Sequence, residues 1–281
     1  MNTKTRFFTN AALASAITLG LASQAVAQQD WDAINEETLR HFRALLQFDT
    51  SDPPGRELLA AEYIRDVLEA EGFEVEMLAN NDERPNVVTR LKGNGSKEPL
   101  LIMAHTDTVN VDPAKWTFPP FSATVDGGYV YGRGAVDDKD NLAAGLMVML
   151  ELKRQGIKLD RDVIFLAESG EEGATEFGIE FMINEHFDKI ESEFCLAEGG
   201  SVARVNREVQ YAGIQSVEKI PYQINLTATG VAGHGSVPLQ TNPVVRLAKA
   251  MAAVADWPSP IRLNETTAAY FERLAGISPP D

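Results

Sequence analysis

The sequence contains a single cysteine, so no disulfide bond can form within the chain. Cys195 lies in a short apolar run, where we expect a buried structural thiol, because a cysteine nucleophile needs a basic and partly exposed setting. Basic residues are also scarce, since 25 Lys and Arg stand against 41 Asp and Glu, for a formal charge of −16. A surface of that charge repels phosphate backbones, which argues against nucleic-acid binding.

Long hydrophobic runs are scarce, and the longest candidate lies near the N-terminus. Lys4 and Arg6 precede an apolar stretch at residues 11–22, and a small-x-small cleavage pattern follows at residues 25–27. The stretch is too short and too rich in alanine for a membrane span. We therefore expect residues 1–27 to be a signal peptide cleaved after Ala27, which makes the mature protein secreted or periplasmic, without a stable membrane span. The alternative is an uncleaved membrane anchor.

The rest of the chain has the composition of a soluble globular protein, with 44% hydrophobic and 23% charged residues. Short apolar runs at residues 99–104, 162–167 and 194–197 are typical of strands buried on both faces. Another strand is expected at residues 125–131, and helical patterns occupy residues 31–47, 56–71, 141–153 and 175–187. This alternation predicts the α/β class, with a mainly parallel sheet flanked by helices on both sides.

The pattern changes near residue 216, where a second domain is expected to begin. Apolar and polar residues alternate at residues 222–226, as in a sheet with one wet face, and an amphipathic helix follows at residues 242–257. We therefore predict one domain at residues 28–215 and the start of a smaller α+β domain at residues 216–281.

Acidic or imidazole side chains follow the apolar runs at the points where strands are expected to end. They are His105 and Asp107, Asp137 and Asp138, Glu171 and Glu172, and Glu198. The carboxyl ends of the strands of an open α/β sheet meet at one crevice. A histidine with several carboxylates is also a ligand set that zinc prefers. The sequence therefore predicts a metal-dependent hydrolase.

Spacing suggests roles for some of these side chains. Asp107 follows His105 by two residues, so both can point to the same side of an extended segment, and the carboxylate can then accept the second ring N–H of a metal-bound imidazole. The alternative is a strand-end turn in which Asp107 is a cap. Asp137 could bridge two cations, whereas Asp138 is placed to cap the following helix.

Glu171 and Glu172 are adjacent carboxylates between two glycines. One of them can ligate a metal ion while the other takes a proton from a water that the ion activates. The alternative for this pair is an acidic turn exposed to solvent.

Four motifs occur in the order AHTDTV, GRGAVDDKD, ESGEEG and AEGG, and the segment WTFPPF lies between the first two. Together they resemble the zinc-dependent exopeptidases of peptidase family M20, which include carboxypeptidase G, aminoacylase-1, carboxypeptidase S and succinyl-diaminopimelate desuccinylase. The resemblance spans residues 36–257. The Glu-Gly-Gly sequence that begins at Glu198 is closer to the branch of carboxypeptidase S and the N-acyl-amino-acid hydrolases.

The resemblance implies a site with two zinc ions, which Co²⁺ can replace. One ion is held by His105, Asp137 and Glu198, and Asp137 bridges to a second ion that Glu172 also binds. Glu171 is then the general base. A hydroxide held by the two zinc ions attacks the amide carbon of a peptide or N-acyl amino acid.

The resemblance implies roles for two further residues. Asp107 is implied as the partner of His105. His234, in the sequence GHGS, resembles a lid residue that reaches the active site of a partner subunit and helps to hold the oxyanion of the substrate. The resemblance therefore implies a catalytic domain at residues 28–215, a lid and dimerisation domain at residues 216–281, and a homodimer when the protein is full length.

The family takes one more zinc ligand, a histidine, from near its C-terminus. The four histidines here are His41, His105, His186 and His234, and none follows His234. We therefore expect a C-terminally truncated member with an incomplete catalytic domain, a partial lid and impaired activity. The alternatives are an inactive remnant that binds metal or a partner without turnover, and a structural Ca²⁺-binding protein, which His105 suits poorly.

Overall fold

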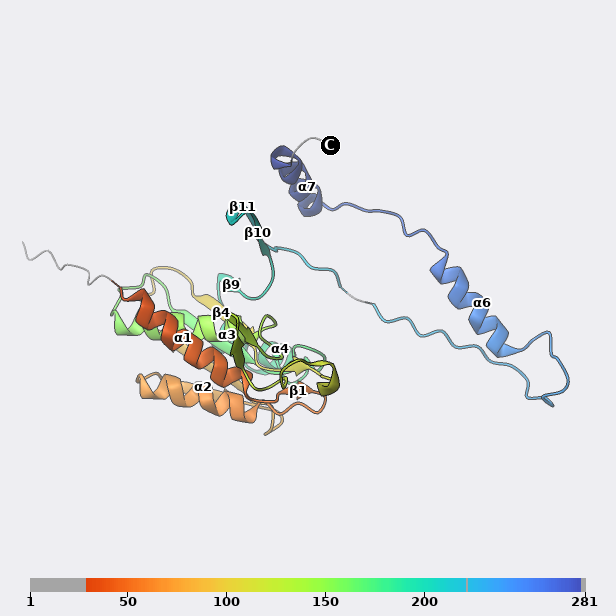
Figure 1. Cartoon of the computed structure of the whole chain (residues 1–281), viewed down its shortest axis with the longest axis horizontal. Coiled ribbons are helices and arrows are strands. Elements are labelled where there is room, and N and C mark those ends of the chain that lie inside the picture. Colours follow the sequence, from red (N-terminus) through yellow and green to blue (C-terminus); the bar gives the residue numbers. More distant parts are fainter. Residues whose placement is uncertain (1–28, 221, 279–281) are drawn as a thin grey trace, which may run out of the picture. The chain divides into compact units, whose positions relative to one another are not determined.

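The computed structural model describes residues 29–220 and 222–278, so the predicted signal peptide at residues 1–27 lies outside the described residues (Figure 1). The chain divides into two compact units, and the boundary lies between Glu198 and Gly199. The predicted boundary falls later, between residues 215 and 216. The second unit therefore also contains the hairpin of β10 (Ser201–Val205) and β11 (Glu208–Gly213).

The described part of the first unit contains five α-helices, and the first three follow the predicted pattern with small differences at their ends. The five are α1 (Trp31–Leu46), α2 (Leu58–Ala70), α3 (Lys139–Arg154), α4 (Ile179–Glu185) and α5 (Phe187–Ile190). The Asp30 side chain caps α1 by accepting the N–H of Ala33 at 3.1 Å. Gly72, with a φ of 76°, follows α2 and suits the left-handed turn that often ends a helix. The prediction of a single helix at residues 175–187 is wrong, because the helix is interrupted at His186, between α4 and α5.

The central sheet has the strand order β2-β3-β8-β4-β9. These strands are β2 (Val75–Leu78), β3 (Asn86–Leu91), β4 (Leu100–His105), β8 (Val163–Glu168) and β9 (Phe194–Leu196). β8, β4 and β9 run parallel to one another, whereas β2, β3 and β8 form antiparallel pairs. The link between β2 and β3, residues 79–85, is too short for a crossover, so these two strands pair antiparallel. The predicted α/β class is confirmed, but the sheet is mixed where a mainly parallel one was predicted, because two of its four strand pairs are antiparallel.

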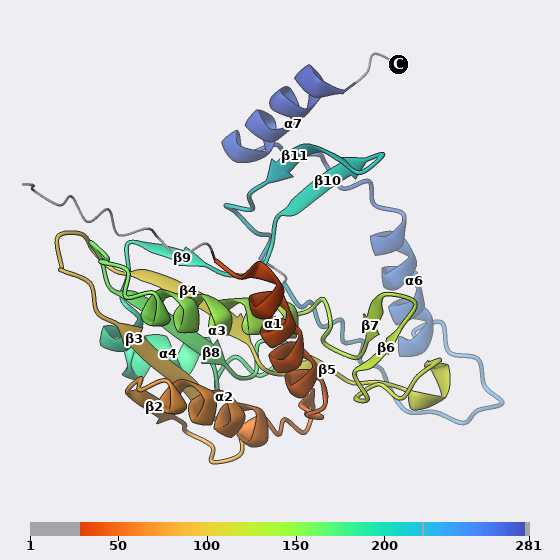
Figure 2. The same cartoon turned by 60° about the vertical axis from the view of Figure 1, so that its left-hand side comes forward.

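Helices cover both faces of this sheet (Figure 2). On one face, α1, α2 and α3 pack their apolar residues, such as Leu45, Ile64 and Leu146, against Phe165 and its neighbours. On the other face, Phe181 of α4 belongs to a second buried cluster that includes strand residues. The predicted burial of Cys195 is wrong, because it lies exposed on β9, at the edge of the sheet.

Two small strand pairs lie outside the central sheet. β1 (Ser51–Asp52) pairs parallel with β5 (Thr108–Val109), immediately after the end of β4. The single strand predicted at residues 125–131 is wrong, because β6 (Thr124–Asp126) and β7 (Tyr129–Tyr131) form a hairpin. Gly127 and Gly128 both have positive φ, which a two-residue hairpin turn of this kind requires.

The second unit contains the β10–β11 hairpin and two helices, α6 (Pro243–Ala255) and α7 (Glu265–Ile277). Asn242 and Asn264 cap these helices through their side chains. The strand pattern predicted at residues 222–226 is wrong for the described residues, where no strand forms at those positions. In the ranges 29–220 and 222–278, no helix combines the length and apolar content needed to cross a membrane.

His41 on α1 gives the first unit a pH-dependent contact with α2. His41 is 5% exposed, and its Nδ1 lies 2.7 Å from the Tyr63 hydroxyl. Burial, and to a smaller degree the charge of Arg40, lower the pKa of His41 below its usual 6.5. The unfolded chain therefore binds a proton here more readily than the folded chain does, so acid favours unfolding.

We therefore expect the free energy of unfolding to fall more steeply below pH 6.5 in the wild type than in His41→Gln. Urea unfolding at pH 8, 6.5 and 5.5 measures both slopes. The pH 8 values isolate the cost of the lost packing, since His41 is neutral there in both states. Equal slopes in the two proteins would contradict the expectation.

Candidate metal centre

His105 ends β4 with its ring fixed in one orientation. Its Nδ1 lies 3.1 Å from the backbone oxygen of Asp107 and 3.3 Å from the Asp107 carboxylate. A carbonyl oxygen can only accept a hydrogen bond, so Nδ1 carries the proton. This leaves Nε2 as the nitrogen that can ligate a metal ion.

Three carboxylates surround Nε2 of His105. Asp137 Oδ1 lies at 2.9 Å, Glu198 Oε2 at 3.6 Å and Glu171 Oε2 at 3.8 Å. The ligand atoms of His105, Asp137 and Glu198 all lie within 4.8 Å of one another, and among the described residues this is the only such group of three. The structure thus brings together side chains from the ends of β4 and β9 and from the turn before α3.

Asp107 connects His105 to the turn that carries Glu171 and Glu172. Its buried carboxylate accepts the backbone N–H of Glu171 at 3.1 Å and that of Glu172 at 3.0 Å. Burial alone would raise the pKa of Asp107, but the hydrogen bond and charge of His105 outweigh it and lower the pKa. The sequence predicted only that Asp107 is a partner of His105, whereas the structure shows that Asp107 also holds this turn.

Glu171 and Glu172 follow β8 on that turn. Burial raises the pKa of Glu171, and the nearby Glu198 carboxylate adds to the effect. Burial and the charge of Asp137 likewise raise the pKa of Glu172. The side chain of Glu171 is 40% exposed, so this carboxylate, 3.8 Å from His105 Nε2, remains open to water and substrate. A carboxylate with a raised pKa is also a stronger base.

Asp138 occupies the N-cap position of α3, as predicted, but its carboxylate does not cap the helix as we expected. It accepts the backbone N–H of His105 at 3.3 Å and a hydrogen bond from Asn141. Burial raises the pKa of Asp138 to about 6. Asp138 therefore supports the end of β4, and the peptide bond that joins it to Asp137 is cis.

The sequence analysis missed two charged residues near the site. Glu168 ends β8 directly beside His105 in the strand register, and its Oε2 has no hydrogen-bond partner among the described residues. Burial raises the pKa of Glu168 to about 8. Lys139, the first residue of α3, is fully buried and donates to the backbone oxygens of Leu45 and Phe48. The motifs ESGEEG and DDKD contain both residues, but only burial distinguishes them from surface charges.

The charges of the site favour a bound cation. Burial alone would lower the pKa of His105, but the carboxylates of Asp107 and Asp137 raise it to about 10. The ring can therefore hold a positive charge that offsets several carboxylates. A divalent cation can take over this role, because His105, Asp137 and Glu198 supply one nitrogen and carboxylate oxygens in a compact set. The residues present thus fit a metal ion.

Two of the remaining histidines, His41 and His186, lie elsewhere in the first unit. His41 is buried against Tyr63, and His186 contacts the edge of Phe181 at 4.9 Å between ring centres. His234 belongs to the second unit, where it is exposed and its Nδ1 lies 2.8 Å from Ser236 Oγ.

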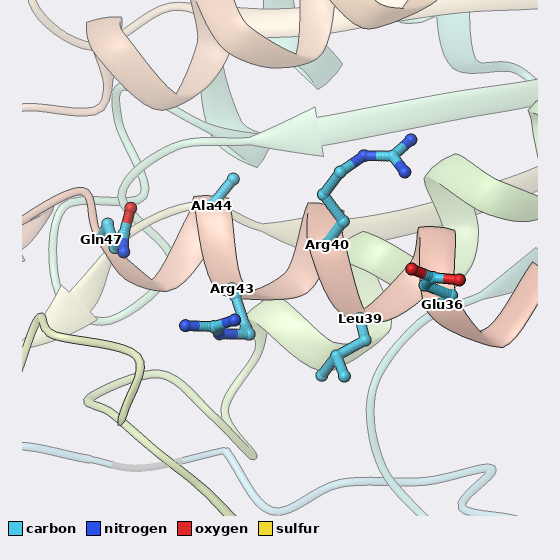
Figure 3. Close-up of a pocket in the computed structure, with 6 residues that line it drawn as sticks. All are labelled: Glu36, Leu39, Arg40, Arg43, Ala44 and Gln47. Carbon is cyan, nitrogen blue, oxygen red and sulfur yellow. The ribbon is translucent and has the colours of Figure 1, made fainter. Parts of the chain in front are cut away.

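A hollow on the surface lies along α1 and contains none of the metal-site residues (Figure 3). Its lining residues belong to this helix and to the residue that follows it: Glu36, Leu39, Arg40, Arg43, Ala44 and Gln47. Arg40 is paired with Glu37, and Arg43 donates to the backbone oxygen of Ala123. We assign no chemistry to this hollow.

Comparisons with known proteins identify one family of peptidases. Residues 101–278 match the family model described as Peptidase family M20/M25/M40. The chain is 34% identical over 181 residues to "Probable carboxypeptidase S-like 2" of Dictyostelium discoideum, a match that covers 61% of this chain and 34% of that protein. It is 32% identical over 206 residues to a "Probable succinyl-diaminopimelate desuccinylase" of Staphylococcus aureus, which covers 72% of this chain and 47% of that protein.

A solved structure gives a similar result. The M20 family metallo-carboxypeptidase Sso-CP2 of Sulfolobus solfataricus is 28% identical, with a TM-score of 0.52, and the match covers 59% of this chain and 38% of that chain. The chain spans between about a third and a half of the length of the curated relatives that it matches.

Proposed function

Because the chain belongs to Peptidase family M20/M25/M40, we propose that it is a metal-dependent hydrolase that cleaves an amide or peptide bond. The observation that carries the proposal is the group of His105, Asp137 and Glu198. The Glu171 carboxylate lies 3.8 Å from Nε2 of His105. Metal ligands and a separate base within one cluster are what hydrolysis by an activated water needs.

Zinc is the metal that we propose, with Co²⁺ as a substitute. His105, Asp137 and Glu198 would hold one ion, and Asp137 and Glu172 would contribute to another. Zinc supplies Lewis acidity when bound, which polarises a carbonyl and lowers the pKa of water. The proposed two-ion arrangement is supported by the position of Glu172 next to Glu171, on the turn that Asp107 holds.

Glu171 is the general base of the proposal. Its partly exposed carboxylate would take a proton from the attacking water and pass it to the leaving nitrogen. Asp107 contributes by accepting the backbone N–H of Glu171 and by fixing the proton on His105 Nδ1. Both contacts exist without any substrate, so the residues are positioned before it binds.

The substrate that we propose is a peptide or an N-acyl amino acid. Two relatives are named for a carboxypeptidase and a desuccinylase, names that denote cleavage of a peptide bond and removal of an acyl group. We also propose that His234 holds the oxyanion of the substrate across a homodimer, and that the protein is exported after cleavage at Ala27. The first of these two proposals rests on the motif GHGS, and the second rests on the N-terminal sequence pattern.

Removal of metal tests the proposed function directly. Dialysis against a chelator is expected to abolish hydrolysis, and added Zn²⁺ or Co²⁺ to restore it, because Glu171 alone cannot activate a neutral water enough. Release of free amine from dipeptides and N-acyl amino acids measures the rate, and elemental analysis measures the metal. Full activity without metal would overturn the proposal. Stoichiometric metal without hydrolysis of any of these substrates would instead favour a metal-binding protein without turnover.

A further inference from the structure

A buried arginine joins three segments around the turn that carries Glu171 and Glu172. Arg84 is 2% exposed, and its Nε and Nη2 donate to the fully buried carboxylate of Glu57 at 3.1 and 2.6 Å. Nη2 also donates to Asp52 at 3.0 Å. The guanidinium thus links the β2–β3 loop, β1 and the start of α2, and its fixed fork matches the geometry of these carboxylates.

Arg84 also contacts both ends of the segment at residues 169–177. The Ser169 hydroxyl donates to the backbone oxygen of Arg84 at 2.9 Å, and the guanidinium lies 4.8 Å from the centre of the Phe177 ring. Gly170 has a φ of 73°, and a side-chain carbon added there would lie 3.2 Å from Arg84 Nη2. The backbone immediately before Glu171 therefore lies against the arginine.

The turn needs such support because it carries two carboxylates into a site that already holds Asp137 and Glu198. The negative charges of these four carboxylates repel one another. Asp107 holds the turn by its backbone N–H groups, but Asp107 is itself an anion. Arg84 is a cation that packs against the backbone and the Phe177 ring of the same segment. Stability alone explains this arrangement poorly, since a buried ion pair often adds little to it.

We propose that Arg84 is a positioning residue that holds the Gly170–Glu172 turn in place, so that Glu172 stays available to a metal ion and Glu171 to proton transfer. This inference rests on the proposed function for its consequence in catalysis. The structural part, that Arg84 restrains the turn, can be measured without any substrate.

The substitution Arg84→Lys keeps the charge but removes the fork, and Arg90→Lys is its matched control. Arg90 lies on β3, the strand that begins two residues after Arg84, and it bonds to Asp162 and to the backbone of Lys189, in contacts unrelated to the turn. Hydrogen exchange of the full chain reports the backbone N–H groups of Glu171 and Glu172, both of which are bonded to Asp107. Arg84→Lys is expected to speed their exchange roughly tenfold, while Arg90→Lys leaves it unchanged.

In hydrolysis, Arg84→Lys is expected to lower kcat by roughly 100-fold with little change in KM, because a small displacement of a base costs that much. If Arg84→Lys does not fold, Asp52→Asn removes one partner of the guanidinium and tests the same restraint. Faster exchange confined to residues 169–177 supports the inference. Unchanged exchange there, or equal acceleration throughout the chain, overturns it. A wild type without hydrolysis overturns the proposed function, and the exchange result still decides whether Arg84 restrains the turn.

Discussion

Replacing Glu171 by glutamine is expected to lower kcat by roughly 10²- to 10⁴-fold, the usual contribution of a general base. The metal content is expected to stay near that of the wild type. The reason is that the Glu171 carboxylate lies outside the group of His105, Asp137 and Glu198. Glutamine keeps the shape of the side chain, and the hydrogen bond from residue 171 to Asp107 comes from the backbone, so the turn should remain in place.

A matched control for this variant is Glu176→Gln, on the same segment but with an exposed side chain. It should keep both activity and metal. Elemental analysis after dialysis and steady-state kinetics measure the two properties separately. Loss of metal from Glu171→Gln would make Glu171 a ligand rather than the base, and unchanged kcat would reject it as the base.

The sequence predicted where the site residues lie along the strands, because a buried strand is a continuous apolar run that ends at a polar residue. The runs before His105 and Glu168 become β4 and β8, which pair in parallel so that these two residues lie side by side. Parallel neighbours end at one edge of the sheet, and the chemistry of the motifs could therefore be placed there without a structure.

Other contacts could not be predicted, because they depend on which distant segments pack together. The sequence gives no sign that Asp107 accepts the N–H groups of the Glu171–Glu172 turn, 64 and 65 residues further on. Arg84 looks like a surface residue in a polar stretch, yet it is buried among Glu57, Asp52 and Phe177. Periodicity reports which face of an element is apolar, but it does not identify the partner of a buried charge.

The same limit explains two wrong predictions, the burial of Cys195 and the single strand at residues 125–131. Cys195 lies in an apolar run that resembles a buried strand, but β9 is at the edge of the sheet and its residues are exposed. The hairpin β6–β7 reads as one strand because its two-residue glycine turn interrupts the alternation only briefly. In both cases the local pattern is compatible with two arrangements, and tertiary packing decides between them.

Replacing Asp137 by alanine is expected to remove the bound metal. Asp137 belongs to the group of three, and only His105 and Glu198 would remain, which is too few for the near-tetrahedral set that zinc prefers. The loss of zinc affinity should exceed the roughly 10- to 100-fold that losing an outer hydrogen-bond partner costs. The side chain of Asp137 is 63% exposed, so its removal should leave the fold intact.

Asp140→Ala is the matched control, because Asp140 is an exposed carboxylate in the first turn of α3. Zinc titration by calorimetry should give about one tightly bound ion in the wild type and in Asp140→Ala, since the described residues form one group of three ligands. Asp137→Ala should show no tight binding, and hydrolysis should be lost with it. If Asp137→Ala retained tight zinc binding, Asp137 would not be a required ligand, and the metal would have to be held by the carboxylates of Glu171, Glu172 and Glu198 around His105.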